Sequence, residues 1–218
     1  MCQEEGINLQ QGMNFRIRGR RAVILMSVRP GAPYADQVED EGRILIYEGH
    51  DQPRRRGGPD PKTLNQELAS PQGTATQNGL FFAAARRNQE GVGAEAVRVY
   101  EKIRAGIWVF NGVFRLEDAW AEQIDGRRVF KFRLTLGETD TEPETMAEEA
   151  PSQTRLIPTP IKLEVWKRDR GRCVMCGSTD NLHFDHIIPW SRGGSSLTAE
   201  NVQLLCARHN LEKHDRIV

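Results

Sequence analysis

Three cysteines and one histidine near the end of the chain have the spacing of metal ligands. Cys173 and Cys176 are separated by two residues, and so are Cys206 and His209 further along. Zinc prefers four thiolate or imidazole ligands in a tetrahedron, and this spacing lets one tight turn present two of them. A module of about sixty residues also has too small a hydrophobic core to be stable without a cross-link such as a bound metal. The pattern therefore predicts a structural zinc site.

Two alternatives accompany this prediction. Residues 173–176 could be a redox-active Cys-x-x-Cys motif with an unrelated third cysteine. His214 lies close after His209 and is a fallback fourth ligand. The fourth cysteine, Cys2, stands apart at the N-terminus and has no predicted role.

Between the two ligand pairs, Asp185 and His186 are adjacent. An imidazole with a pKa of about 6.5 can take a proton from water at neutral pH. A hard divalent cation on oxygen ligands can polarise a phosphoryl oxygen and stabilise a leaving oxygen. Adjacent residues of a strand point to opposite sides. A strand could therefore place Asp185 and His186 on opposite sides of the scissile bond, which is compatible with phosphodiester hydrolysis. The alternative is a polar pair on a surface hairpin, and His183 is predicted to be a solvent-facing strand residue.

The residues around this pair resemble the HNH nuclease family, in the order Cys-x-x-Cys, Asp-His-Ile-x-Pro, Gly-Gly, Asn-x-x-x-Leu-Cys, Asn and Lys over residues 165–216. The resemblance implies that Asp185 and Asn210 bind the catalytic metal, Mg²⁺ or Mn²⁺. It implies that His186 is the general base and that Asn201 orients its ring. Lys213 is then expected to contact phosphate. His209 and Asn210 depart from the common family form, which has Cys and His there.

The first part of the chain carries a second, more dispersed series of motifs. In order, they are Tyr34-Ala-Asp-Gln-Val38, Glu41-Gly-Arg-Ile-Leu-Ile-Tyr-Glu-Gly49, Gln77-Asn-Gly-Leu-Phe-Phe-Ala83, Val97-Arg-Val99, Phe110-Asn-Gly-Val-Phe114, Trp120 and Val129-Phe-Lys-Phe-Arg133. The series resembles the SRA (YDG) domain, which reads 5-methylcytosine or 5-hydroxymethylcytosine by flipping the base into a pocket. The family's Tyr-Asp-Gly reads Phe-Asn-Gly here.

A flipped cytosine needs aromatic faces to stack on and an acceptor for its exocyclic amine. We expect Tyr34 and Tyr47 to sandwich the ring and Asp36 to accept the hydrogen bond. An extra residue before Gly42 makes Gln37 an alternative to Asp36, and both tyrosines could instead be ordinary core residues. A loop holds three more candidates, which either follow the DNA backbone or are simply solvated: Arg54, Arg55 and Arg56.

The elements expected around these residues give an α+β protein. Short β-branched and aromatic runs at residues 21–28, 43–47, 96–100, 106–110, 113–116 and 128–136 predict strands, and residues 74–87 predict a helix. Many short strands favour a closed or half-closed SRA-like β-barrel with flanking helices, over residues 1–137. In the HNH part, residues 161–218, we expect a helix over 162–170, a hairpin over 182–189 and a helix from about 198, which is a ββα unit.

Residues 138–160 hold one basic and six acidic residues, without aromatics, and read as a linker. The net charge of zero therefore combines this acidic stretch with two mildly basic parts, so it does not argue against DNA binding. No apolar run approaches the length of about twenty residues of a membrane span, and the N-terminus does not read as a signal peptide. We expect a cytoplasmic protein.

Together these features predict a modification-dependent, type IV-like restriction endonuclease of bacterial defence. It would bind double-stranded DNA carrying modified cytosine, and cutting both strands favours a homodimer. One alternative is an HNH nuclease or nickase that reads unmodified sequence or DNA structure. The other is a non-catalytic reader of modified DNA.

Overall fold

The computed structural model describes residues 9, 11–19, 21–137 and 156–213. The chain divides into two compact units, Met1–Asp140 and Thr141–Val218. Most of the expected linker, residues 138–155, lies outside the described part. Ile157, which the expected boundary left in that linker, is buried in the core of the second unit. Within the described part, no helix is long and apolar enough to cross a membrane.

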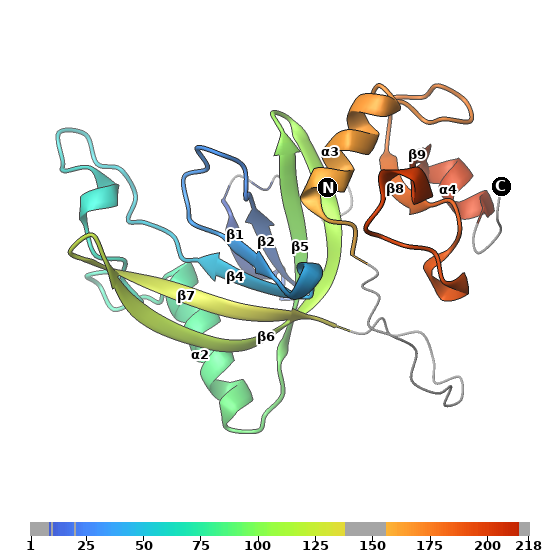
Figure 1. Ribbon diagram of the computed structural model, residues 1–218. Coiled ribbons are helices and arrows are strands. Elements are labelled where there is room, and N and C mark those ends of the chain that lie inside the picture. Colours follow the sequence, from blue (N-terminus) through green and yellow to red (C-terminus); the bar gives the residue numbers. More distant parts are fainter. Residues whose placement is uncertain (1–8, 10, 20, 138–155, 214–218) are drawn as a thin grey trace. The chain divides into compact units, whose positions relative to one another are not determined.

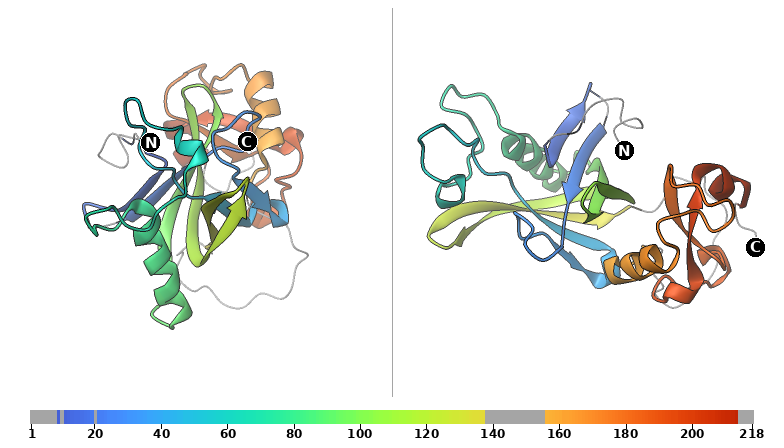
Figure 2. Two further views of the ribbon diagram at one scale, coloured as in Figure 1. Left: turned by 90° about the vertical axis from the view of Figure 1, so that its left-hand side faces the viewer. Right: turned by 90° about the horizontal axis from the view of Figure 1, so that it is seen from above.

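The first unit is built on one mixed sheet of seven strands (Figure 1). In sheet order the strands are β1 (Met13–Ile17), β2 (Arg21–Met26), β5 (Glu95–Arg104), β6 (Ile107–Ile124), β7 (Arg127–Leu136), β4 (Ile44–Glu48) and β3 (Gln37–Glu39). Strands β2 and β5 are parallel, and all other neighbours are antiparallel. The single described α-helix of this unit, α2 (Gln77–Gln89), packs on the sheet, with the short helices η1 (Asp40–Gly42) and η2 (Pro61–Thr63) in the loops (Figure 2).

The sheet is strongly curved around Phe81 of α2. In a flat sheet β1 and β7 would be about 19 Å apart, which is four strand spacings. Instead the Phe81 ring lies 5.3 Å from Phe15 on β1 and 6.1 Å from Phe132 on β7, between ring centroids. Because β1 and β3 form the two edges and do not pair, the sheet is a half-closed barrel. This confirms the predicted α+β class. Of the two predicted forms of the barrel, closed and half-closed, the structure has the half-closed one.

Strands β1 and β3 were not predicted, and two further details differ from the sequence prediction. The predicted strands at 106–110 and 113–116 are parts of one long strand, β6, whose pairing with β5 contains a bulge at Asn111, beside Gly112. Gly112 has a φ of 118°, which favours glycine, so the Asn-Gly pair that suggests a turn is accommodated inside the strand. The helix α2 begins and ends slightly later than predicted, and Thr76 caps it by accepting the N–H of Gly79.

The second unit is a small ββα module. It contains α3 (Thr159–Arg168), the antiparallel strands β8 (Leu182–His186) and β9 (Val202–Cys206), the short helices η3 (Trp190–Arg192) and η4 (Ala199–Asn201), and α4 (Ala207–Lys213). The prediction of a helix from about residue 198 is wrong, because residues 202–206 form β9. Every residue of β9 is buried, so the strand lacks the alternation that usually identifies one.

Candidate functional site

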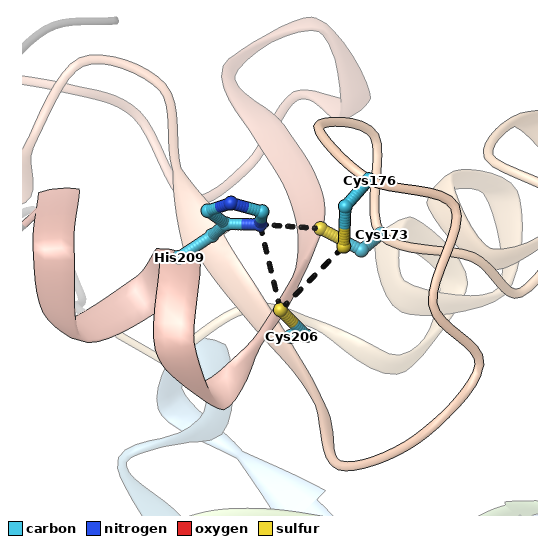
Figure 3. A group of neighbouring side chains, drawn as sticks. All are labelled: Cys173, Cys176, Cys206 and His209. Carbon is cyan, nitrogen blue, oxygen red and sulfur yellow. Dashed lines mark hydrogen bonds between the residues drawn. The ribbon is translucent and has the colours of Figure 1, made fainter.

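The four predicted zinc ligands come together at the junction of β9 and α4 (Figure 3). Their ligand atoms all lie within 4.8 Å of one another. Nδ1 of His209 is 3.4 Å from Sγ of both Cys173 and Cys206, and Sγ of Cys176 is 3.9 Å from Sγ of Cys206. Zinc bonds of about 2.0–2.3 Å in a tetrahedron separate neighbouring ligands by about 3.5–3.8 Å. The cluster therefore has the size and donor set of a zinc site.

The local backbone supports this arrangement. The N–H of Gly177 donates to the carbonyl of Cys173, which closes the turn between the first two cysteines. Burial alone would raise the pKa of the Cys173 thiol, but hydrogen bonds from the Cys206 backbone and from His209 outweigh it and lower the pKa to about 6. Thiolate is the form that binds metal. His214, the alternative ligand, lies outside the described residues.

Asp185 lies on β8, opposite Gln203 of β9, and faces α4. Its Oδ2 atom is 2.9 Å from Nζ of Lys213 and 3.3 Å from Nε2 of Gln203. Lys213 also donates to the carbonyl of His186 at 2.7 Å, and its side chain is only 1% exposed. Lys213 is therefore an internal partner of β8. In this structure α4 turns the ammonium group inward, and its contact with DNA phosphate stays a prediction.

The donors available around Asp185 fit a divalent cation. Among the described residues, no hydrogen bond reaches Oδ1 of Asp185, so this oxygen can serve as a ligand. Asn210 lies three residues before Lys213 and therefore on the same face of α4, towards β8. His183 is two residues before Asp185, and its Nε2 is buried without a hydrogen-bond partner. This corrects the prediction that His183 faces solvent. Carboxylate and amide oxygens suit Mg²⁺ or Mn²⁺, whereas an imidazole is a ligand of transition metals.

His186 is held by the loop that follows it. Its Nε2 is 2.8 Å from Oγ of Ser196, a residue only 2% exposed. Asn201 spans the same loop: its Oδ1 accepts the N–H of Ile188 at 2.8 Å, and its Nδ2 donates to the carbonyls of Ile188 and Ser195. Asn201 thus supports the His186 ring through the loop and Ser196, and not by a direct bond to the ring.

Arg168 of α3 binds the backbone on both sides of Asn201. Its guanidinium donates to the carbonyls of Ala199 and Val202, both at 2.6 Å, and its Nε pairs with Asp169. Asp169 in turn accepts the N–H of Leu204 on β9. Arg168 and Ser196 were not predicted from the sequence, because neither has a distinctive spacing relative to His186.

The first unit contains an open pocket of about 360 Å³, beside the end of β4. Such a volume lies within the range of about 300–1,000 Å³ typical of small-molecule sites. Tyr34, Lys62 and Ile124 line it, together with three buried residues: Glu48, Arg127 and Val129. The Tyr34 ring stacks on His50, with 5.4 Å between centroids and 18° between planes. Lys62 places its Nζ 4.0 Å from the centroid of the Tyr34 ring.

A network of buried ion pairs links the residues that line this pocket. Glu48 pairs through Oε2 with Lys131 at 3.0 Å and through Oε1 with Arg127 at 3.5 Å. Arg127 also pairs with Asp51 at 2.6 Å, and Asp51 with Lys62 at 2.9 Å. The backbone of Ala35 binds both Glu48 and Lys131, so the loop that carries Tyr34 is tied to the network. Clustered buried charges beside a pocket are typical of functional sites.

The comparisons with known proteins concern the two units separately. Residues 173–216 match the family model described as HNH endonuclease. These residues form an HNH endonuclease domain. The match supports a metal-dependent DNA endonuclease and confirms the family that the C-terminal motifs indicate. No curated protein matches the chain.

Similar solved structures include SRA domains. The SUVH5 SRA complex with hemimethylated CG DNA is 26% identical, with a TM-score of 0.41, and the match covers 63% of this chain and 79% of that one. The SUVH5 SRA domain bound to fully hydroxymethylated CG DNA is 24% identical, with a TM-score of 0.41 and coverages of 63% and 80%. SUVH6 of Arabidopsis thaliana in complex with SAM is 19% identical, with a TM-score of 0.40 and coverages of 83% and 28%.

In the first unit, the structure separates the predicted pocket residues. Tyr34 lines the pocket, but Tyr47 is 1% exposed and points into the core, with its hydroxyl 3.2 Å from Nε2 of His50. Tyr47 does not line this pocket, because neighbouring strand residues face opposite sides and Glu48 takes the pocket side, and the sandwich of Tyr34 and Tyr47 stays a prediction. Burial lowers the pKa of His50 to about 4, so this ring is neutral at neutral pH.

Asp36 and Gln37, the alternative pocket groups, have other roles or positions. Asp36 accepts the N–H groups of Ser27 and Glu48, and so joins the loop after β2 to the end of β4. Burial raises the pKa of Asp36 to about 6. Gln37 is exposed on β3, opposite Ile46. Neither side chain lines this pocket, and the assignment of either one as the group that binds the base stays a prediction.

The predicted DNA contacts Arg54, Arg55 and Arg56 are exposed in a loop that surrounds a hollow of about 330 Å³. Arg54 lies 3.7 Å from Asp60, which is a weak, solvated ion pair. Their position is compatible with contacts to phosphate, which stay a prediction.

Gly194 provides a test of the loop that holds His186. A Cβ atom at this position would lie 1.8 Å from the carbonyl oxygen of Ile188 and 2.7 Å from Nδ2 of Asn201. Gly194→Ala must therefore displace the loop, and we expect DNA cleavage to fall by about 10²-fold, as for a catalytic group displaced by about 1 Å. Cleavage rates and zinc content should be measured together. A wild-type rate with unchanged zinc would show that the loop does not position the catalytic group.

Proposed function

We propose that this protein is a DNA endonuclease directed by modified cytosine, of the type IV restriction kind, which serves bacterial defence. The first unit would hold a flipped 5-methylcytosine or 5-hydroxymethylcytosine, and the HNH domain would hydrolyse the backbone nearby. This proposal rests on the pocket that Tyr34 lines together with the buried residues Glu48 and Arg127. An aromatic wall with fixed polar groups is what a flipped base requires.

In the HNH domain, His186 acts as the general base that takes a proton from the attacking water. Ser196 holds the ring and Asn201 holds the loop, so the imidazole is oriented before DNA arrives. Asp185 and Asn210 are the proposed ligands of the catalytic metal. When bound by these residues, Mg²⁺ or Mn²⁺ would supply Lewis-acid stabilisation of the charge that develops on the phosphate and on the leaving oxygen.

The domain holds one such catalytic set, whereas a double-strand break needs two hydrolytic events. We therefore propose that the protein acts as a homodimer, with one HNH domain for each strand. Arg54, Arg55 and Arg56 would follow the phosphate backbone beside the pocket, and their contribution would weaken as salt concentration rises.

The test compares plasmids that differ only in cytosine modification. With Mg²⁺ or Mn²⁺, we expect the wild-type protein to cut DNA containing 5-methylcytosine or 5-hydroxymethylcytosine and to spare the unmodified plasmid. Tyr34→Ala should lose this preference, because the stacking face of the pocket is gone; base–aromatic stacking contributes about 1–3 kcal/mol.

Phe110→Ala is the matched control, since Phe110 is an exposed aromatic residue of β6 that does not line the pocket. This variant should cut like wild type. Equal cutting of modified and unmodified plasmids by the wild-type protein would overturn the proposal and favour a nuclease that reads unmodified DNA.

A further inference from the structure

The imidazole of His183 brings a buried nitrogen to the same face of β8 as Asp185. His183 lies opposite Leu205 of β9, and Asp185 lies two residues further, opposite Gln203. Side chains two residues apart on a strand share one face, so both point towards α4, where Asp185 meets Lys213. Nε2 of His183 is closed to water and has no hydrogen-bond partner. A buried polar atom without a partner lowers stability, and a bound ion is one explanation for it.

The described neighbours of His183 do not satisfy this nitrogen. Leu205, its partner on β9, is apolar and packs with Cys173 and Cys206. The zinc cluster needs no further ligand, because it already has the four that zinc prefers. Within the described part of the chain, no hydrogen bond or ion pair joins His183 to Asp185. The lone pair of Nε2 is therefore available to a ligand from outside the chain.

On Asp185, the donor that is left for an ion is Oδ1. The other oxygen, Oδ2, is 2.9 Å from Nζ of Lys213 and 3.3 Å from Nε2 of Gln203. Lys213 is itself fixed, since its ammonium group also donates to the carbonyl of His186 at 2.7 Å. Carboxylates that bind a metal are usually held by hydrogen bonds of this kind, which orient the ligand. The carboxylate is therefore oriented before an ion arrives.

We infer that His183 is a further ligand of the metal that Asp185 is proposed to bind, with Nε2 as its donor. Cα atoms two residues apart on a strand are separated by about 6.4–6.8 Å, and both side chains can reach a point between them. A divalent cation is smaller than a water molecule, so a nitrogen that is closed to water can still bind an ion. The inference rests on the proposed function, and it adds His183 to Asp185 and Asn210, the two ligands that the HNH resemblance implies.

The added imidazole determines which ion the site prefers. Mg²⁺ binds through oxygen and keeps several water ligands, whereas imidazole is a ligand of transition metals. Asp185 and His183 together therefore favour a transition-metal ion such as Mn²⁺ over Mg²⁺. His186 lies on the other face of β8 and is held by Ser196, so the two imidazoles have separate tasks.

The test measures Mn²⁺ binding to the full-length, zinc-loaded protein in the absence of DNA. Mn²⁺ has little affinity for thiolates, so the zinc site keeps its own metal and does not contribute. Pulsed electron paramagnetic resonance detects a nitrogen atom that is bonded directly to Mn²⁺. We expect this nitrogen signal in the wild-type protein, and competition with Mg²⁺ should show that Mn²⁺ binds about 10-fold or more tightly.

His183→Ala should remove the nitrogen signal and weaken Mn²⁺ binding by about 10-fold or more, because a ligand is lost. Its affinity for Mg²⁺ should change by about 3-fold or less, since Mg²⁺ prefers oxygen ligands. His186→Ala is the matched control, because it also removes an imidazole from β8 but from the other face, and it should keep the nitrogen signal. Thermal unfolding of each variant identifies any that fails to fold.

His183→Asp distinguishes a metal ligand from a residue with a structural role alone. The aspartate supplies oxygen in place of nitrogen, so this variant should bind Mn²⁺ without the nitrogen signal. Its preference for Mn²⁺ over Mg²⁺ should fall to about 3-fold or less. A residue that only fills space beside β9 would produce no such change in metal preference.

Wild-type protein that binds Mn²⁺ without the nitrogen signal, or folded His183→Ala that keeps the signal, would overturn the inference alone. The first of these outcomes needs no variant, so the test stays decisive even if His183→Ala does not fold. Asp185→Ala should lose Mn²⁺ binding altogether. If Asp185→Ala instead bound Mn²⁺ with wild-type affinity, the catalytic metal site of the proposed function would itself be overturned.

Discussion

Replacing His186 with alanine is expected to lower the rate of DNA cleavage by about 10³-fold while leaving DNA affinity unchanged. His186 is the imidazole that Ser196 holds at 2.8 Å, and Asp185 beside it lies on the opposite face of β8. The measurement is the single-turnover cleavage rate of modified DNA, together with affinity in the absence of the catalytic metal.

Added imidazole should restore part of the rate in His186→Ala, because a small base can enter the space left by the ring. A variant that was merely misfolded would show no such rescue. Asp180→Ala, an exposed position shortly before β8, is the control and should cut like wild type. Cleavage by His186→Ala at the wild-type rate would exclude His186 as the base.

The cluster of zinc ligands and the Asp185–His186 pair could be predicted because each motif consists of residues that lie close together in the sequence. Two-residue spacings bring ligands together within single turns, whatever the rest of the fold does. Roles that depend on docking between elements were not predicted in this way. Lys213 has the charge of a phosphate contact, but the packing of α4 on β8 turns it inward against Asp185. His183 likewise has a buried Nε2 only because that face of the strand is covered.

The base pocket could be predicted only in part, for a related reason. Tyr34 was found because its loop carries a recognisable motif, but Glu48, Lys131 and Arg127 meet only after β4 pairs with β7. Their separation along the chain is large, and no periodic pattern links them. The choice between Tyr47 and Glu48 depended on which face of β4 points into the core, and a strand buried along nearly its whole length does not reveal this.

Removing zinc is expected to unfold the HNH domain and abolish cleavage, while the first unit keeps its fold and its affinity for modified DNA. The four ligands join the turn at 173–176, the end of β9 and the start of α4. Two of them, Cys173 and Cys206, are themselves part of a small core cluster with Leu205. Structural zinc contributes about 10–16 kcal/mol in small domains, which equals or exceeds a typical domain stability of about 5–15 kcal/mol.

The experiment uses a zinc-selective chelator, after which Mg²⁺ or Mn²⁺ is supplied in excess so that loss of the catalytic metal cannot explain the result. Zinc content, thermal unfolding and cleavage should be followed together, and Cys206→Ser should reproduce the effect of the chelator. Cys2→Ser is the matched control, because Cys2 lies at the other end of the sequence, outside the Cys-x-x-Cys and Cys-x-x-His pairs. His209→Cys should retain zinc and much of the activity, since four thiolates form an equally suitable site.

If chelation left both unfolding and cleavage unchanged, the cluster could not be the element that stabilises this domain. Recovery of cleavage when zinc is added back, but not with Mg²⁺ alone, would assign the two metals to two separate sites in one small domain.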